Sequence, residues 1–178
     1  MAVVVGKITK LTHRRGFPTS PQKTMPKLKH IDLKHHPYMV TAVTADRRPI
    51  FRDPKSADIV LDAIFFGKEQ GWYYLLAFVI MPDHIHLIVV PEEKNISECM
   101  KAIKGFSARE INKLYQRSGT IWQRSFYDYI LEGEAKALGR IRYIEYNPVR
   151  KGLAANSGDY EYSSARYRDR TDFEKFFK

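Results

Sequence analysis

The first half of the chain alternates between apolar runs and polar breaks, and this pattern predicts four secondary-structure elements. Residues 38–45 form a β-branched, alternating run, which is typical of a strand. Between residues 54 and 67 the apolar positions recur at helical spacing. Residues 72–80 are almost continuously apolar and too few for a buried helix of normal length, so they predict a central strand. Residues 84–90 predict a further strand.

The second half of the chain predicts a helix, a strand and another helix. Residues 96–116 carry apolar side chains at roughly helical spacing, and Asn95 precedes them as a plausible N-cap. Residues 121–131 are rich in aromatic side chains and predict a strand over at least part of their length. Residues 134–147 predict a helix that Pro148 ends.

The order of the seven elements indicates the fold. The first six run strand, helix, strand, strand, helix, strand, which is the split βαβ, or ferredoxin-like, arrangement. The seventh is an added C-terminal helix. We therefore expect an α+β fold in which a ferredoxin-like core has an antiparallel sheet with helices on one face, followed by the added helix.

Two histidines on one predicted strand are the first candidates for chemistry. Side chains alternate between the two faces of a strand, so His84 and His86 point to the same side and Ile85 and Leu87 to the other. Two adjacent imidazoles can hold a metal ion or a phosphate oxygen. An arbitrary His-x-His pair is more often without function, but the apolar character of the rest of this strand favours a site.

The helix predicted at residues 134–147 has an apolar stripe and an opposite polar face. The stripe consists of Ala137, Leu138, Ile141 and Ile144. Glu145 also falls within the stripe, and the pattern offers no reason for it. The polar face carries Lys136, Arg140, Tyr143 and Asn147. A phenol, an amide and two cations suit a phosphodiester site, although spacing alone favours an ordinary solvated face. Tyr127 and Tyr129 lie in the aromatic block at residues 121–131, where we expect them to pack in the core.

Charge and composition narrow the class of partner. Lys and Arg number 30 and Asp and Glu 20, so the net charge of the 178-residue chain is +10. Such an excess favours nucleic acid or an anionic membrane surface. No apolar run approaches the roughly 20 residues that span a bilayer. The single cysteine excludes an intrachain disulfide and a cysteine-based zinc site. We expect a cytoplasmic, nucleoid-associated protein with no membrane partner.

Four sequence blocks together resemble a known family. His84-Ile85-His86 resembles the His-hydrophobic-His motif of HUH endonucleases. Three further blocks resemble the REP-associated branch of single-tyrosine transposases, and the resemblance covers roughly residues 38–165. These blocks are residues 122–128, 143–149 and 160–164. The family often has a histidine at the position of Tyr129, so this chain departs from the pattern there.

The resemblance implies an activity and assigns residues to it. Family members cut and rejoin single-stranded DNA near short hairpins through a covalent 5′-phosphotyrosine. The implied nucleophile is Tyr143, and the implied ligands of a divalent metal, Mg²⁺ or Mn²⁺, are His84, His86 and Asn147. The expected partner is single-stranded or hairpin DNA. Basic residues expected to contact it are Arg14, Arg15, Lys104, Arg109, Arg124, Arg140, Arg142, Arg150 and Lys151.

We expect three parts of the chain to have separate roles. Residues 1–36 form a basic arm of eight lysines and arginines against one acidic residue, residues 37–165 the HUH transposase catalytic domain, and residues 166–178 a tail. The rival hypothesis is a non-catalytic protein of the same fold that binds single-stranded or hairpin DNA. A weaker third is a metal-dependent phosphoesterase acting on small nucleotides. The sequence leaves open whether the chain acts as a monomer or as a homodimer.

Overall fold

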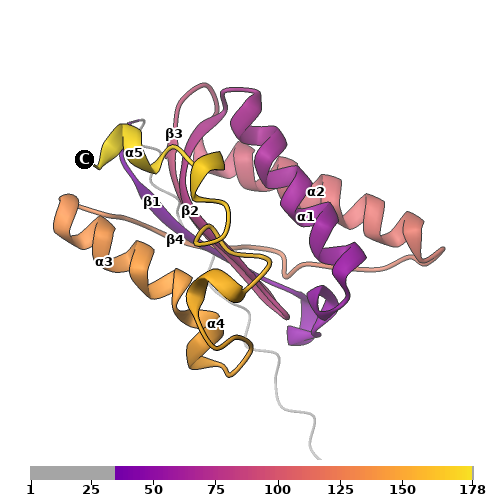
Figure 1. Cartoon of the computed structure of the whole chain (residues 1–178). Helices are drawn as coiled ribbons and strands as arrows, with labels where there is room; N and C mark the ends of the chain where they lie inside the picture. The colour runs from indigo at the N-terminus through magenta and orange to yellow at the C-terminus, as the bar shows by residue number, and fades with distance from the viewer. Residues whose placement is uncertain (1–34, 178) are drawn as a thin grey trace, which may run out of the picture.

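The structure is a computed structural model that describes residues 35–177, and it has an antiparallel sheet with helices on both sides (Figure 1). The strands are β1 (Tyr38–Val43), β2 (Tyr73–Met81), β3 (His84–Pro91) and β4 (Tyr127–Ile130). They lie in the order β2-β3-β1-β4, and each neighbouring pair is antiparallel. This is the strand order of the ferredoxin-like arrangement, so the predicted fold class is confirmed.

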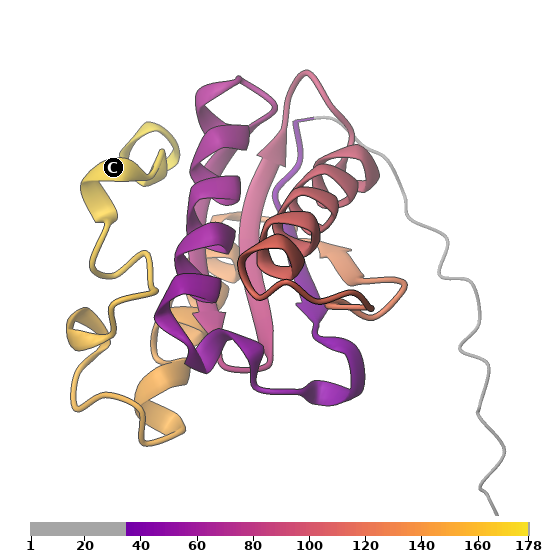
Figure 2. The ribbon, with the colours of Figure 1, turned by 90° about the vertical axis from the view of Figure 1, so that its right-hand side faces the viewer.

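Helices α1 (Pro54–Glu69) and α2 (Ile96–Leu114) cover one face of the sheet (Figure 2). Asp53 caps the start of α1 by accepting a hydrogen bond from the Ser56 amide. Asn95 caps α2 and forms a capping box with Glu98, so the predicted N-cap is confirmed. Their apolar residues and one face of the sheet form a first hydrophobic core.

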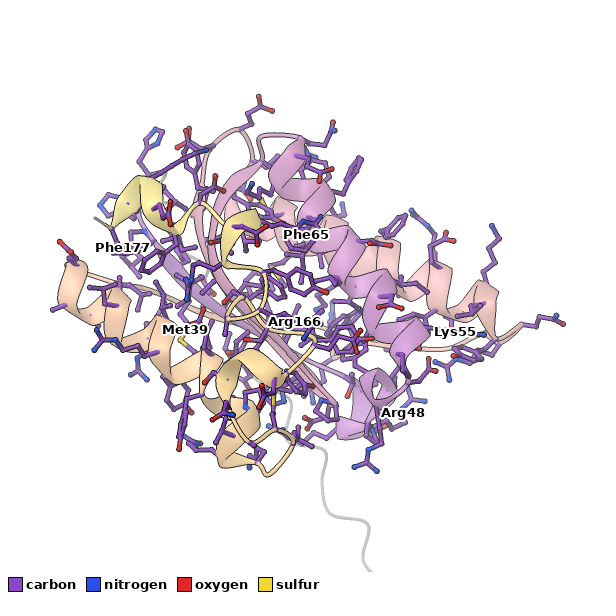
Figure 3. All side chains as sticks on the ribbon, viewed as in Figure 1. Met39, Arg48, Lys55, Phe65, Arg166 and Phe177 are labelled. Atoms are coloured by element: carbon purple, nitrogen blue, oxygen red, sulfur yellow. The ribbon has the colours of Figure 1, made fainter. Side chains whose placement is uncertain are left out.

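Helix α3 (Glu134–Glu145) lies on the opposite face of the sheet, followed by the short helices α4 (Asn147–Arg150) and α5 (Phe173–Phe176). Ala137, Ile141 and Ile144 pack there in a second core with residues of β2 and β3. Figure 3 labels Met39 of this second core beside α3 and Phe65 of the first core beside α1. The two core helices thus lie on one face as expected, and the added helix covers the other face, because β2 and β3 are apolar on both sides and both faces need cover.

The C-terminal segment covers the outer edge of β2. The Ile80 amide donates to the Tyr162 carbonyl, and the Ser164 amide donates to the Phe78 carbonyl. Further along, the Asp172 carboxylate accepts from the Leu75 amide. These bonds satisfy backbone groups that an edge strand otherwise leaves unpaired. Residues 166–177 thus pack on the same domain as the sheet.

Short 3₁₀ turns occupy several connections: Ala45–Arg47, Ile50–Arg52, Ser157–Asp159 and Arg168–Arg170. Two predicted elements are shorter than expected. Within residues 121–131 only β4 is a strand, and Trp122 makes a single bridge to Thr44. The last predicted helix divides at Tyr146, so Tyr143 lies on α3 and Asn147 begins α4.

Candidate active site

The two histidines lie side by side on the face of the sheet that α3 covers. In β3, His84 and His86 alternate with core residues, and the next residue on their face, Ile88, belongs to the second core. The two imidazole centroids are 4.8 Å apart, and the rings meet edge to face. The prediction that both rings share one face is confirmed by the strand register.

Each histidine has a partner at its Nδ1 atom. His84 Nδ1 lies 2.6 Å from Asp83 Oδ1, so its N–H donates to the carboxylate. His86 Nδ1 lies 2.8 Å from Thr41 Oγ1, the residue opposite it on β1. Donation from Nδ1 to the carboxylate leaves the Nε2 lone pair of His84 for a ligand, and the tautomer of His86 that donates to Thr41 leaves its Nε2 in the same state. Carboxylate and hydroxyl groups behind the rings also fix the ring orientations.

Burial sets the charge state of His86. Burial lowers the pKa of His86 to about 3, with a contribution from the neighbouring His84, so this imidazole is neutral near pH 7. Burial acts to raise the pKa of Asp83, but the hydrogen bonds and charges of His84 and Arg47 outweigh it and hold that pKa below its usual value. Asp83 is therefore an anion beside His84. A neutral imidazole and a carboxylate-supported one are the forms that bind divalent metals.

The two histidines alone are too few ligands for a divalent metal, so a side chain of another type must complete the site. Within residues 35–177, no group of three or more His, Cys, Asp or Glu side chains is placed to hold a metal. The residue expected as third ligand, Asn147, is buried at the start of α4, 4% exposed. With the Asn147 amide oxygen as third ligand, coordination positions would remain for phosphate and water; the oxygen donors suit Mn²⁺ or Mg²⁺, whereas the imidazoles favour a transition metal.

Tyr143 lies on the flank of α3 that faces β4. The Arg140 guanidinium is 5.6 Å from the centroid of the Tyr143 ring and 5.7 Å from that of Tyr129 on β4. The Arg150 guanidinium is 4.9 Å from the centroid of the same Tyr143 ring. Tyr143 is partly buried against the second core. Ile88, which shares a face of β3 with the two histidines, packs with α3 in the second core, so α3 and the two imidazoles lie on the same side of the sheet.

The end of α3 is anchored beside the row of residues that contains His86. Glu145 is buried and accepts hydrogen bonds from Arg168 Nη2, at 2.6 and 2.7 Å, and from Ser164 Oγ, at 2.6 Å. The neighbouring Ser163 forms a bridge with Val79, which stands opposite His86 in the sheet. This network explains the acidic residue in the apolar stripe. Glu145 ties α3 to the segment that covers β2.

The basic residues expected at the DNA fall into two groups. Four lie on the α3 side: Arg140, Arg142, Arg150 and Lys151. Lys104 and Arg109 lie on α2, on the opposite side of the sheet. Lys104 Nζ donates to the carbonyls of the loop before β4, at 2.8 Å to Gln123, and burial lowers its pKa to about 8. Arg124 is exposed in that loop. Arg14 and Arg15 lie outside the described residues.

Tyr127 and Tyr129 contradict their predicted role as core residues. They are 44% and 40% exposed, because β4 is the outer strand and their side of it is only partly covered. Both stand on the face of the histidines, since Tyr127 is opposite Thr41 and Tyr129 is opposite Met39. Sequence pattern alone does not reveal which strand is at the edge of a sheet.

Four residues that support the site were not identified from sequence. One sequence feature could have identified Asp83, namely its position directly before His84. No sequence feature could have identified Thr41, Ser164 and Arg168, because strand register or the path of the C-terminal segment brings each to its partner. These side chains hold the expected ligands and α3 in place.

The fold and the paired histidines define a ferredoxin-like protein with a candidate metal site under an added helix. A family model described as "Transposase IS200 like" matches residues 32–147, more than half of the chain. The chain therefore belongs to the IS200-like transposase family.

Two similar proteins carry more specific names. One from Haemophilus influenzae, named as a candidate REP-associated tyrosine transposase, is 33% identical over 108 residues, which cover 54% of this chain and 61% of that protein. The chain thus spans about three-fifths of the length of this relative. A solved structure of a REP-associated tyrosine transposase bound to a REP hairpin matches with a TM-score of 0.67 at 21% identity, covering 80% of this chain and 84% of that one. At that identity the likeness shows the fold alone.

Within residues 35–177, no helix is both long and apolar enough to span a bilayer.

Proposed function

We propose that the chain is a metal-dependent transposase that cuts and rejoins single-stranded DNA beside a hairpin, with Tyr143 as the nucleophile. The observation that carries the proposal is the histidine pair. Both rings lie on the sheet face covered by α3 and are held through Nδ1 by Asp83 and Thr41, and Tyr143 on that helix contacts the guanidinium groups of Arg140 and Arg150. The family and the REP-associated names of the two similar proteins support the substrate class.

In the proposed cleavage step, the Tyr143 oxygen attacks the phosphorus of a phosphodiester in line with the leaving 3′-oxygen. The bond from phosphorus to that 3′-oxygen breaks, the leaving oxygen takes up a proton, and the tyrosine hydroxyl loses one. The products are a 5′-phosphotyrosine and a free 3′-OH. Because one phosphodiester replaces another, a later 3′-OH can attack the phosphotyrosine and rejoin strands without ATP.

The chain's own residues orient this reaction. Asp83 and Thr41 hold the two imidazoles, and the network around Glu145 holds the end of α3. His84, His86 and Asn147 would hold Mg²⁺ or Mn²⁺, which when bound polarises a phosphate oxygen and stabilises its developing charge. Arg140 and Arg150 contact the Tyr143 ring and can contact the phosphates on either side of the cut. Since α3 packs on its own sheet, we propose that Tyr143 serves the site of the same subunit.

Covalent capture tests the proposal against the non-catalytic alternative. The full chain is incubated with Mn²⁺ and a labelled hairpin that carries a single-stranded flank, and the products are separated by denaturing electrophoresis. We expect a protein–DNA adduct that disappears when EDTA removes the metal. Retardation in a native gel with no adduct under denaturing conditions would instead identify a hairpin-binding protein without catalysis.

A further inference from the structure

The two exposed tyrosines of β4 have no role in the proposed chemistry. Tyr127 and Tyr129 form what we call the tyrosine strip, two rings on the same side of the outer strand. The hydroxyl of Tyr129 donates to the Met39 thioether, a weak acceptor. Large aromatic side chains that remain in solvent on a structured strand are typical of binding surfaces.

The tyrosine strip adjoins the histidines across the sheet. His86, Thr41 and Tyr127 stand opposite one another on β3, β1 and β4. Strands lie about 4.8 Å apart, so Tyr127 is about 10 Å from His86 along this row. About three stacked nucleotides at 3.4 Å each cover that distance. A strand whose phosphate reaches the histidines can therefore place nearby bases on the tyrosines.

The positive charge around the strip suits binding of a negatively charged nucleic-acid strand. The Arg140 guanidinium contacts the rings of both Tyr129 and Tyr143, and the Arg150 guanidinium contacts the Tyr143 ring. Aromatic and guanidinium groups thus lie together between β4 and α4. Single-strand binding surfaces combine these elements, because bases stack on aromatic faces while cations follow the backbone.

We propose that the tyrosine strip is a stacking platform for unpaired bases of single-stranded DNA next to the scissile phosphate. This inference rests on the proposed function and extends it to the flanking strand. Each ring stacks on one base, and stacking tolerates any base because every base has a π face. The strip thereby selects an unpaired flank over a duplex, whose bases are already stacked within the helix.

Binding of two hairpins by the full chain tests the inference. One hairpin has a short single-stranded flank containing 2-aminopurine, and the other lacks the flank. We expect Tyr127→Leu and Tyr129→Leu each to weaken binding of the flanked hairpin about tenfold and to reduce 2-aminopurine quenching. The hairpin without a flank should bind all variants as it binds the wild type. Tyr127→Phe and Tyr129→Phe keep the ring and should behave like the wild type.

Phe106→Ala is the matched control, because Phe106 is 42% exposed on α2, on the other side of the sheet. Flanked-hairpin affinity and quenching that stay at wild-type values in both leucine variants would overturn the inference. Equal losses for both hairpins would also overturn it, since they would indicate a general defect. The proposed function has a separate readout: a wild-type chain that forms no adduct refutes catalysis, whereas an adduct with no effect of the leucine variants refutes only the strip.

Discussion

At the scale of single residues, the partners of the two Nδ1 atoms decide which nitrogen each imidazole can offer. The Asp83 carboxylate accepts a hydrogen bond from His84, and its negative charge makes the Nε2 atom of that ring a stronger ligand for a metal. The corresponding partner of His86 is the uncharged hydroxyl of Thr41. These two contacts prepare the pair for a divalent cation, so their loss should weaken metal binding before it affects the fold.

Replacement of Asp83 tests this idea. Asp83→Asn removes the carboxylate charge behind His84 at similar volume. We expect the Mn²⁺ concentration that gives half-maximal adduct to rise by about tenfold or more, as measured by metal titration of hairpin cleavage. Asp62→Asn, an exposed change on α1, is the control and should leave the titration unchanged. An identical midpoint in Asp83→Asn would contradict a role of Asp83 in supporting a metal ligand.

At the scale of elements, the placement of α3 depends on a buried ionic network. Glu145 is 8% exposed and receives three hydrogen bonds from the segment that covers β2. Loss of one partner leaves a charge with poor solvation, which costs more than the intact pair contributes. The network therefore keeps the end of α3, and with it the start of α4, beside the row of His86.

Removal of Glu145 should destabilise the protein. For Glu145→Ala we expect the free energy of unfolding to fall by about 2 kcal/mol, below the range for fully buried pairs because the Arg168 side chain is a third exposed. Urea denaturation measures the loss. Glu174→Ala changes an exposed glutamate and should stay within about 0.5 kcal/mol of the wild type. Equal stabilities of the two variants would show that the network around Glu145 does not stabilise the fold.

The same elements show what sequence can predict. Apolar periodicity identified β1, β2, β3 and both helices of the first core, because local pattern determines them. The period of two residues placed His84 and His86 on one face. Thr41 could not be found this way, since its contact depends on the register between strands far apart in sequence. The burial of Glu145 and the exposure of Tyr127 likewise depend on which elements pack nearby, so only the structure reveals them.

At the scale of the whole molecule, positive charge and candidate chemistry coincide on one side of the sheet. Four of the basic residues expected at the DNA lie on or directly after α3 and α4, near Tyr143. Lys104 instead supports the loop before β4 from the other side. We infer that DNA binds to the α3 side, where backbone contacts and the reactive groups are adjacent.

Salt dependence of binding tests which side meets the DNA. Arg142→Ala and Lys151→Ala should each reduce the slope of log affinity against log salt by about 1, as measured by fluorescence anisotropy with the flanked hairpin. Arg109→Ala removes an arginine from α2 and should leave the slope unchanged. A reduced slope for Arg109→Ala, with none for the other two, would place the DNA on the opposite side.

The central claim is that Tyr143 becomes covalently linked to the DNA. The most direct measurement compares adduct formation by Tyr143→Phe and Tyr146→Phe with Mn²⁺ and the labelled flanked hairpin. Tyr146 lies three residues further along and is 53% exposed, so it controls for the loss of a nearby hydroxyl. We predict that Tyr143→Phe binds the hairpin with unchanged affinity and forms no adduct, while Tyr146→Phe forms it at the wild-type yield. An adduct at the wild-type yield in Tyr143→Phe would contradict the account.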